Sequence, residues 1–130
     1  KLIKVVIAKV PFVDALTTLS NDSLPLTKME YDEFGNPSKF KDDFDNIKNI
    51  TPYHNIKKQY YPSILSYSGI LDPRVRYDEP LKWTAKLRDN TTSNNPILIH
   101  FYDFGHFGPT NENKIIQNMS QKQLFILENI

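Results

Sequence analysis

Asp72 and His106 are the two residues whose types and positions in this sequence indicate chemistry. Asp72 follows a predicted strand over Tyr61–Gly69, and His106 follows another over Pro96–Phe101. A carboxylate and an imidazole on neighbouring strand-end loops can meet, and the carboxylate then fixes the tautomer of the ring and supports its protonated form. The residues alone leave a second interpretation open at each position, since an Asp-Pro pair is a common turn and a loop histidine is often simply exposed.

The order of this pair along the chain fits a known arrangement, but the nucleophile is missing from it. In hydrolases that carry a serine on a strand-to-helix elbow, the acid follows the serine and the histidine follows the acid. The elbow needs a glycine two residues before and two residues after the serine, and the 130 residues contain no such window. Ser68 precedes Gly69 but lacks the upstream glycine. We therefore do not interpret Ser68 as a nucleophile.

Strands that alternate with helices have to position this pair. Apolar, β-branched segments predict three strands, at Leu2–Ala8, Tyr61–Gly69 and Pro96–Phe101. Periodicity and turn signals predict four helical segments, at Asp14–Leu19, Lys39–Lys48, Tyr77–Asp89 and Glu112–Leu127. Alternation at this spacing implies right-handed crossovers. We therefore expect an α/β fold in which about three parallel strands, buried on both faces, are flanked by helices.

Residue spacing predicts one particular face on each of the two longest helical segments. One face of the segment over 77–89 carries Tyr77, Leu81, Thr84, Ala85 and Arg88. The apolar stripe of the last segment consists of Ile115, Ile116, Met119, Ile126 and Leu127. Helical spacing of this kind is typical of amphipathic helices that pack on a core.

The polar stretch from Ser20 to Ile50 is harder to interpret, because its only clear signal besides the predicted helix is a turn at Gly35-Asn36-Pro37. In parallel sheets the working residues lie in the loops at the carboxyl ends of the strands. Three loops qualify, namely Pro11–Asp14, Gly69–Arg76 and Tyr102–Thr110.

Composition excludes several classes of function. A length of 130 residues fits one domain, and 16 basic against 15 acidic residues leave a charge of +1, so no strong field attracts nucleic acid or an anionic membrane. The absence of cysteine excludes disulfides, thiolate metal sites and a cysteine nucleophile, and it fits a reducing, cytoplasmic location. No apolar run approaches the roughly 20 residues of a membrane span. The three histidines lack metal-ligand spacing, and His100 in its apolar strand fits a core role, so we expect no metal and no cofactor.

Several motifs in a fixed order resemble a known family. They are Val10-Pro11-Phe12-Val13-Asp14, Leu24-Pro25-Leu26-Thr27, Glu30-Tyr31-Asp32-Glu33-Phe34-Gly35-Asn36-Pro37, Tyr61-Pro62-Ser63-Ile64-Leu65, Leu71-Asp72-Pro73-Arg74-Val75, Glu79-Pro80-Leu81-Lys82-Trp83 and Gly105-His106. This order resembles the C-terminal part of the oligopeptidase B (protease II) group in the prolyl oligopeptidase family of serine peptidases. The resemblance implies an α/β-hydrolase fold. The family joins that domain to a β-propeller and cleaves short peptides after Arg or Lys. We therefore expect residues 1–130 to be a partial α/β-hydrolase domain that lacks the nucleophile-bearing part and the propeller.

The resemblance also implies roles for individual residues. Asp72 and His106 match the acid and base of the triad, and Arg74 matches an arginine that holds a substrate backbone carbonyl. Three further residues match the pocket for the basic P1 side chain: Phe12 along its stem, Glu30 as its ion-pair partner, and Asp32 as a second carboxylate. Without the resemblance, the acidic residues over 30–33 are more typical of a solvated face.

Two positions depart from the family pattern. Phe107 stands where the family has a glycine after its histidine, which puts the conformational freedom of the His106 loop in doubt. His54 replaces an acid in the stretch Thr51-Pro52-Tyr53-His54-Asn55.

The expected function is the C-terminal portion of a serine oligopeptidase that acts on short basic peptides and is inactive alone. We expect it to pair with an N-terminal fragment of the same peptidase, or with itself, through the Leu2–Ala8 strand edge, because an uncovered edge is a template for another chain. Two alternatives stay open. One is a non-catalytic remnant or binding module that keeps the fold, and the other is a truncation of an intact enzyme.

Overall fold

The computed structural model describes residues 2–130, and Lys1 lies outside the described residues. The elements are β1 (Val5–Lys9), α1 (Ala15–Leu19), α2 (Thr27–Phe34), α3 (Lys41–Ile50), a short 3-10 turn η1 (Pro52–Asn55), β2 (Ser63–Gly69), α4 (Asp78–Asn90), β3 (Ile97–Tyr102) and α5 (Glu112–Asn129). Within residues 2–130, no helix is both long and apolar enough to cross a membrane.

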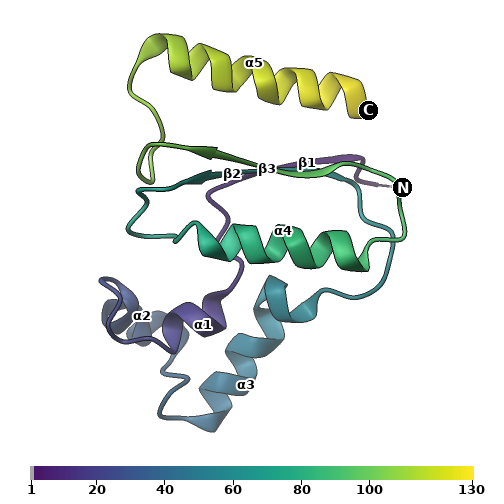
Figure 1. Cartoon of the computed structure of the whole chain (residues 1–130). Helices are drawn as coiled ribbons and strands as arrows, with labels where there is room; N and C mark the ends of the chain where they lie inside the picture. Colours follow the sequence, from purple (N-terminus) through teal and green to yellow (C-terminus); the bar gives the residue numbers. More distant parts are fainter. Residues whose placement is uncertain (1) are drawn as a thin grey trace.

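The three strands form a parallel sheet in the order β1-β2-β3. Figure 1 shows α5 on one face of this sheet and α4 on the other, with α1, α2 and α3 beyond α4. The register pairs Ile64 with Ile97 and ends with Gly69 opposite Tyr102. The predicted α/β architecture of parallel strands with flanking helices is confirmed.

Each face of the sheet carries its own hydrophobic cluster, because successive strand residues point to opposite faces. The cluster under α5 consists of Leu65, Tyr67, Tyr102 and Phe125. The cluster over α4 consists of Ile64, Leu87 and Ile97. A third cluster joins α1 to α3 and consists of Ala15, Leu16, Leu19 and Ile47. The helical layer beyond α4 therefore has a core of its own.

The outer strands are less buried than the sequence predicted. Only β2 is buried along its whole length, whereas Val5 to Ala8 of β1 are half-buried and Leu98 of β3 is 43% exposed. β1 and β3 form the two edges of this sheet, and cover from one helix on each face suffices only for the central strand. The prediction that all three strands are buried on both faces is wrong for β1 and β3.

The face of α4 that packs on the sheet differs from the face that the sequence suggested. Tyr77 and Leu81 are 44% and 42% exposed, and Ala85 and Arg88 are exposed as well. The buried face consists of Pro80, Thr84 and Leu87, at the helical spacing i, i+4 and i+7. Periodicity located the helix, but two faces had similar patterns and only the tertiary packing distinguishes them.

The predicted apolar stripe of α5 is exposed over most of its length. Met119 is 53% exposed and Leu127 is 70% exposed, and Phe125 is the buried residue of this helix. Helix α5 contacts β1 and β2, and its Phe125 packs with Tyr102 of β3, but this support is narrow and covers little of the helix surface. The stripe is therefore a surface feature of this chain.

Helix α2 was not predicted, since its mixed sequence shows no clear helical period. Its start is fixed by buried Thr27, whose hydroxyl donates to the carbonyl of Thr18 at 3.0 Å. It ends at Gly35, whose φ of +88° lies in the left-handed region that favours glycine, and whose N–H donates to the carbonyl of Tyr31. The turn signal at residues 35–37 was thus the end of an unrecognised helix.

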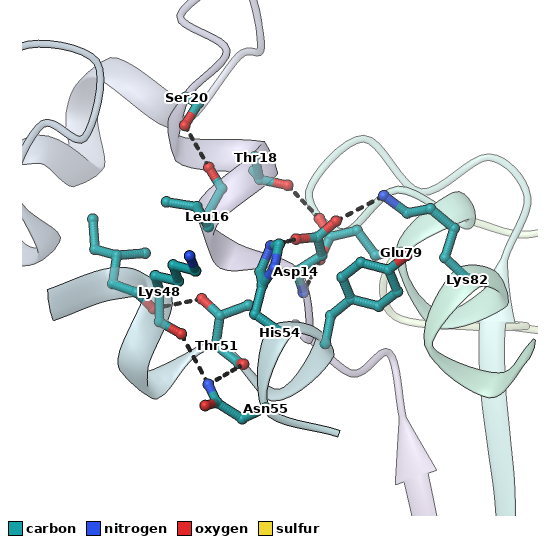
Figure 2. A network of polar contacts seen from close by, with 12 residues as sticks. Asp14, Leu16, Thr18, Ser20, Lys48, Thr51, His54, Asn55, Glu79 and Lys82 are labelled. Atoms are coloured by element: carbon teal, nitrogen blue, oxygen red, sulfur yellow. Dashed lines mark hydrogen bonds and ion pairs between the residues drawn. The ribbon is translucent and has the colours of Figure 1, made fainter. Parts of the chain in front are cut away.

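A buried polar network ties the helical layer to α4, as Figure 2 shows. Asp14 is fully buried, and its Oδ2 accepts from Lys82 Nζ at 2.7 Å while its Oδ1 lies 3.4 Å from His54 Nε2. Buried Glu79 accepts from the backbone N–H of Asp14 at 3.1 Å and from the hydroxyl of Thr18. Two carboxylates from different elements thus lie in one contact region, where both oxygens of Glu79 accept hydrogen bonds and Asp14 Oδ1 has no hydrogen-bond partner among the described residues.

The pKa values of Glu79 and Lys82, two groups in this network, are both raised. Burial raises the pKa of Glu79, although hydrogen bonds from Thr18 and Asp14 oppose the shift. Burial alone would lower the pKa of Lys82, but its hydrogen bond and ion pair with Asp14 outweigh that effect and the pKa is raised. A raised lysine pKa contributes stability that is present at neutral pH and is lost only above the ordinary lysine value.

We predict that Lys82→Met destabilises the full chain by about 2 kcal/mol, because it leaves the Asp14 carboxylate buried without its cation. The value is below that of a fully buried pair because the Lys82 side chain is 37% exposed. Lys86→Met is the matched control, since Lys86 also lies over the Tyr53 ring and donates to a carbonyl, but does not contact Asp14. Urea denaturation at pH 7 measures the free energy of unfolding of both variants. An equal loss of stability in the two would contradict the role of Asp14.

Gly69, the last residue of β2, allows an unusually close approach of the chain that follows β3. A Cβ built on Gly69 would lie 2.2 Å from the carbonyl oxygen of Phe104 and 3.0 Å from that of Gly105. Backbone atoms such as these carbonyl oxygens cannot move aside in the way that the end of a flexible side chain can. The loop that carries His106 therefore crosses the end of β2 only because residue 69 has no side chain.

We predict that Gly69→Ala destabilises the chain by about 2 kcal/mol through overpacking and displaces the His106 loop. Gly105→Ala is the matched control, because a Cβ there meets only the carbonyl oxygen of Leu71 at 3.6 Å and the backbone has no positive φ. This control should change stability by less than about 0.5 kcal/mol. Urea denaturation and the imidazole NMR signals of His106 measure both effects, and a similar response of the two variants would refute the close-approach argument.

Candidate active site

Asp72 and His106 meet at the carboxyl edge of the sheet. Asp72 lies just after β2 and His106 just after β3, and His106 Nδ1 is 3.0 Å from Asp72 Oδ2. The other carboxylate oxygen, Oδ1, accepts from the backbone N–H groups of Arg74 at 2.8 Å and Val75 at 3.1 Å. Both oxygens of the carboxylate are therefore held, and the acid cannot rotate away from the imidazole without losing these hydrogen bonds.

Burial distinguishes the two members of the pair. The Asp72 side chain is fully buried, whereas the His106 side chain is 28% exposed. With Nδ1 donating to the carboxylate, the proton is assigned to Nδ1 and Nε2 becomes the proton acceptor. A buried acid that orients a half-open imidazole is the arrangement that a general base requires.

The loop around His106 accommodates Phe107 without strain. The N–H of Gly108 donates to the carbonyl of Gly105 at 3.0 Å and closes a turn. Gly108 has a φ of +82°, while Phe107 is not among the residues with positive φ. The residue that needs left-handed freedom is therefore Gly108, and the doubt that Phe107 raised about this loop does not apply.

Arg74 presents its guanidinium beside the pair. Its side chain is exposed, and its Cζ lies 5.1 Å from the centre of the Phe107 ring. Among the described residues it forms no ion pair with a carboxylate. A guanidinium held by a ring face, with its donors directed to solvent, can hydrogen-bond to a carbonyl oxygen of a bound chain.

Helix α2 carries both acids that were predicted to line the pocket for a basic side chain. Glu30 and Asp32 are both in α2, but residues two apart on a helix do not share a face. Glu30 is half-buried, and burial followed by the charge of Glu33 raises its pKa. Asp32 is exposed. The acid beside Glu30 is therefore Glu33.

Phe12, the predicted aromatic wall of that pocket, lies in the loop after β1. It packs edge-on against Phe34 of α2, with ring centres 6.5 Å apart, and borders the core of α1 and α3. In Figure 1, α2 lies toward the same end of the molecule as the loops that follow β2 and β3. No direct contact joins Phe12 or Glu30 to the Asp72–His106 pair within residues 2–130.

Two features of the site edge were not predicted. Val10, directly after β1, has a φ of +46°, a strained conformation for a β-branched residue, and its N–H donates to the carbonyl of Tyr67. No sequence signal marks a valine for that conformation. The second feature is the Asp14 network of Figure 2, for which His54 at the position of a family acid was the only signal.

His100 differs from the core role that the sequence suggested. His100 is half-buried rather than a core residue, and it lies against the Tyr67 ring at 5.3 Å between ring centres. Within residues 2–130 no group of three or more His, Cys, Asp or Glu side chains could hold a metal ion.

Comparison with known proteins gives matches along the whole chain. The family model described as the prolyl oligopeptidase family matches residues 1–130. Protease 2 of Moraxella lacunata is 39% identical over 131 residues, which cover 100% of this chain and 19% of that protein. Dipeptidyl aminopeptidase BI of Pseudoxanthomonas mexicana is 35% identical and is matched over 98% of this chain and 18% of its own length. The chain thus spans about a fifth of the length of these relatives.

Solved structures of related peptidases also match the chain along nearly its whole length. Oligopeptidase B from Leishmania major has a TM-score of 0.92 at 41% identity, covering 98% of this chain and 18% of that one. The closed form of oligopeptidase B from Trypanosoma brucei with covalently bound antipain has a TM-score of 0.88 at 39% identity, covering 95% of this chain and 17% of that one. These neighbours confirm the sheet as part of a peptidase α/β-hydrolase fold. Since sequence and structure match over essentially the whole chain, it belongs to the prolyl oligopeptidase family.

Proposed function

We propose that this chain supplies the acid and base of a serine peptidase that cleaves short peptides after Arg or Lys, and that the serine lies on another segment. The observation that carries the proposal is the Asp72–His106 pair, in which a fully buried carboxylate orients a half-exposed imidazole at 3.0 Å. The relatives named protease 2 and oligopeptidase B support the reaction class.

In the proposed reaction, the imidazole of His106 moves the protons. His106 Nε2 takes the proton of the serine hydroxyl as its oxygen attacks the scissile carbonyl, and later gives it to the leaving amine. Asp72 stabilises the imidazolium through Nδ1, and its other oxygen accepts from two backbone N–H groups. The serine and the oxyanion hole have to come from elsewhere.

The open side of β1 is the surface that we assign to the nucleophile-bearing segment. β1 pairs only with β2 among the described strands, and its residues Val5 to Ala8 are half-buried. A strand added there would pair with β1 and cover those apolar side chains. It would also end at the same edge as the Asp72 and His106 loops, since parallel strands share their carboxyl edge.

Recognition of a basic side chain is assigned to Glu30, with Phe12 along the stem and Arg74 on a backbone carbonyl. Glu30 is half-buried, so its carboxylate would bind a guanidinium or ammonium more strongly than an exposed acid would. Asp32, which the sequence also suggested, is exposed on another face of α2, and we assign it no direct contact.

We predict that the 130-residue chain alone shows no turnover of a fluorogenic arginyl peptide and no labelling by a serine-directed phosphonate. A chimera in which this chain replaces the matched region of Leishmania major oligopeptidase B should show both. In the chimera, Asp72→Asn should lower kcat by about 10⁴-fold, because the imidazole loses its orienting carboxylate. Steady-state kinetics on the folded proteins measure these values.

Asp103→Asn is the control for that experiment, because Asp103 is an exposed acid that comes directly after β3. It should leave kcat within about twofold of the parent value. Turnover by the isolated chain would refute the location of the serine. A folded but inactive chimera would favour the alternative, a module that keeps the fold without peptidase activity.

We also predict that Glu30→Gln in the chimera lowers kcat/KM for an arginyl substrate by about 10-fold or more, through loss of a charge-assisted contact. Since the pKa of Glu30 is raised, the acid becomes anionic only as pH rises through that raised value, so the difference between parent and variant should grow with pH across this range. Asp32→Asn is the matched control and should change kcat/KM by less than about twofold. A larger effect of Asp32→Asn, or an equal loss with a neutral P1 residue, would contradict the assignment.

A further inference from the structure

Phe107 lies against two functional side chains of the candidate site. Its ring centre is 5.3 Å from that of the His106 imidazole, with the two planes at 85°, and 5.1 Å from Cζ of Arg74. The ring is 76% exposed, so it buries little apolar surface. An aromatic side chain that contributes little to the core, but contacts both the base and the cation, indicates a role in the site itself.

The guanidinium of Arg74 depends on this ring. Within residues 2–130 that guanidinium has neither an ion pair nor a hydrogen bond, and it lies over the face of Phe107. The other two arginines of the chain are held differently. Arg76 Nε donates to Asp78 Oδ1 at 2.8 Å, and Arg88 Nε donates to a backbone carbonyl at 2.7 Å. Since a guanidinium stacks favourably on an aromatic face, the position of Arg74 is set by Phe107.

The contact between Arg74 and Phe107 completes a closed set of contacts that includes the acid–base pair. The backbone N–H of Arg74 donates to Asp72 Oδ1, and Asp72 Oδ2 contacts His106 Nδ1. Phe107 follows His106 in the chain, and its ring contacts Arg74 again. The loops after β2 and β3 are therefore joined twice, once by the acid and the base and once by the cation and the ring. The guanidinium is thereby held at a fixed place relative to the imidazole.

We propose that Phe107 is a positioning residue for Arg74, whose guanidinium it holds in place for a backbone carbonyl of the bound peptide. This role rests on the proposed function, in which Arg74 binds such a carbonyl. A free arginine side chain samples many rotamers and loses that freedom when a ligand binds, whereas a stacked guanidinium has already lost part of it. Phe107 stands where the family pattern has a glycine, so this support is a feature of this chain.

The chimera with Leishmania major oligopeptidase B tests this role with a fluorogenic peptide that has one residue before its arginine. Phe107→Leu should raise KM about threefold and leave kcat within about twofold, because a contact made equally in the ground state and the transition state affects KM alone. Phe107→Tyr keeps the ring face and should keep the parent KM. Phe44→Leu is the matched control, since exposed Phe44 also has a cation near its ring, Lys48 at 5.9 Å, but belongs to α3. This control should leave KM within about 1.5-fold of the parent value.

A double-mutant cycle in the chimera distinguishes support of Arg74 from direct contact with the peptide. Arg74→Met alone should raise KM about 10-fold, since it removes a charged donor. Phe107→Leu added to Arg74→Met should cause no further rise, because a positioning residue acts only through the residue that it positions. If the two effects on KM multiply, the ring contacts the peptide directly and the proposal is wrong.

NMR of the 130-residue chain tests the support of Arg74 without any turnover. The chain contains three arginines, and each has one Nε–H signal. Phe107→Leu should shift the signal of Arg74 and lower its order parameter, because the guanidinium loses the ring that holds it. Arg76 and Arg88 are internal controls, since their Nε groups are hydrogen-bonded to other partners and their signals should not change.

Three results would overturn the proposal. They are an unchanged KM in Phe107→Leu, effects that multiply in the double-mutant cycle, and an Arg74 guanidinium that is equally ordered in the parent chain and in Phe107→Leu. Urea denaturation of each variant ensures that folded proteins are compared. An inactive parent chimera would instead refute the proposed function, and the NMR result would still decide whether Phe107 holds Arg74.

Discussion

The close contact between the end of β2 and the loop after β3 is the constraint on which the geometry of the site depends. The register places Gly69 opposite Tyr102, so both strands end at one edge of the sheet. The carbonyl of Phe104 then passes so near to Gly69 that a Cβ would lie 2.2 Å from it. A loop forced outward by a side chain would carry His106 away from Asp72. The acid–base pair is therefore positioned first by backbone packing and only then by its hydrogen bond.

Asp14 and Asp72 are two buried aspartates with different surroundings. Asp14 and Asp72 are both fully buried at the side chain, and each contacts a histidine. Asp14 is neutralised by Lys82 at 2.7 Å, so its region is a closed ion pair that holds helices together. Asp72 has backbone N–H partners instead of a cation, and its imidazole partner is half-exposed. The two imidazoles are similarly exposed, at 27% for His54 and 28% for His106, so the arrangements differ in the lysine that Asp14 has and Asp72 lacks.

The sequence allowed the architecture to be predicted but not the details of burial. Three strands, the helices around 41–50, 78–90 and 112–129, and the meeting of Asp72 with His106 follow from periodicity and from the shared edge of parallel strands. Helix α2 was missed because its stability comes from contacts such as that of Thr27 with Thr18, which the local sequence does not reveal. A motif gives residue types but not the directions of their side chains, and in α2 the acid whose charge acts on Glu30 is Glu33.

Tyr102 links the hydrophobic cluster under α5 to the acid–base pair. It is the last residue of β3 and pairs with Gly69 across the sheet, so its backbone belongs to the contact that positions His106. Burial, and then the negative charge of Asp72, raise the pKa of its phenol. The phenol therefore stays protonated near that carboxylate and remains a donor, yet it has no hydrogen-bond partner. The side chain of Tyr102 thus belongs to the core under α5, while its backbone belongs to the contact that positions the His106 loop. A change in the packing of that core is for this reason transmitted to the acid–base pair through one residue.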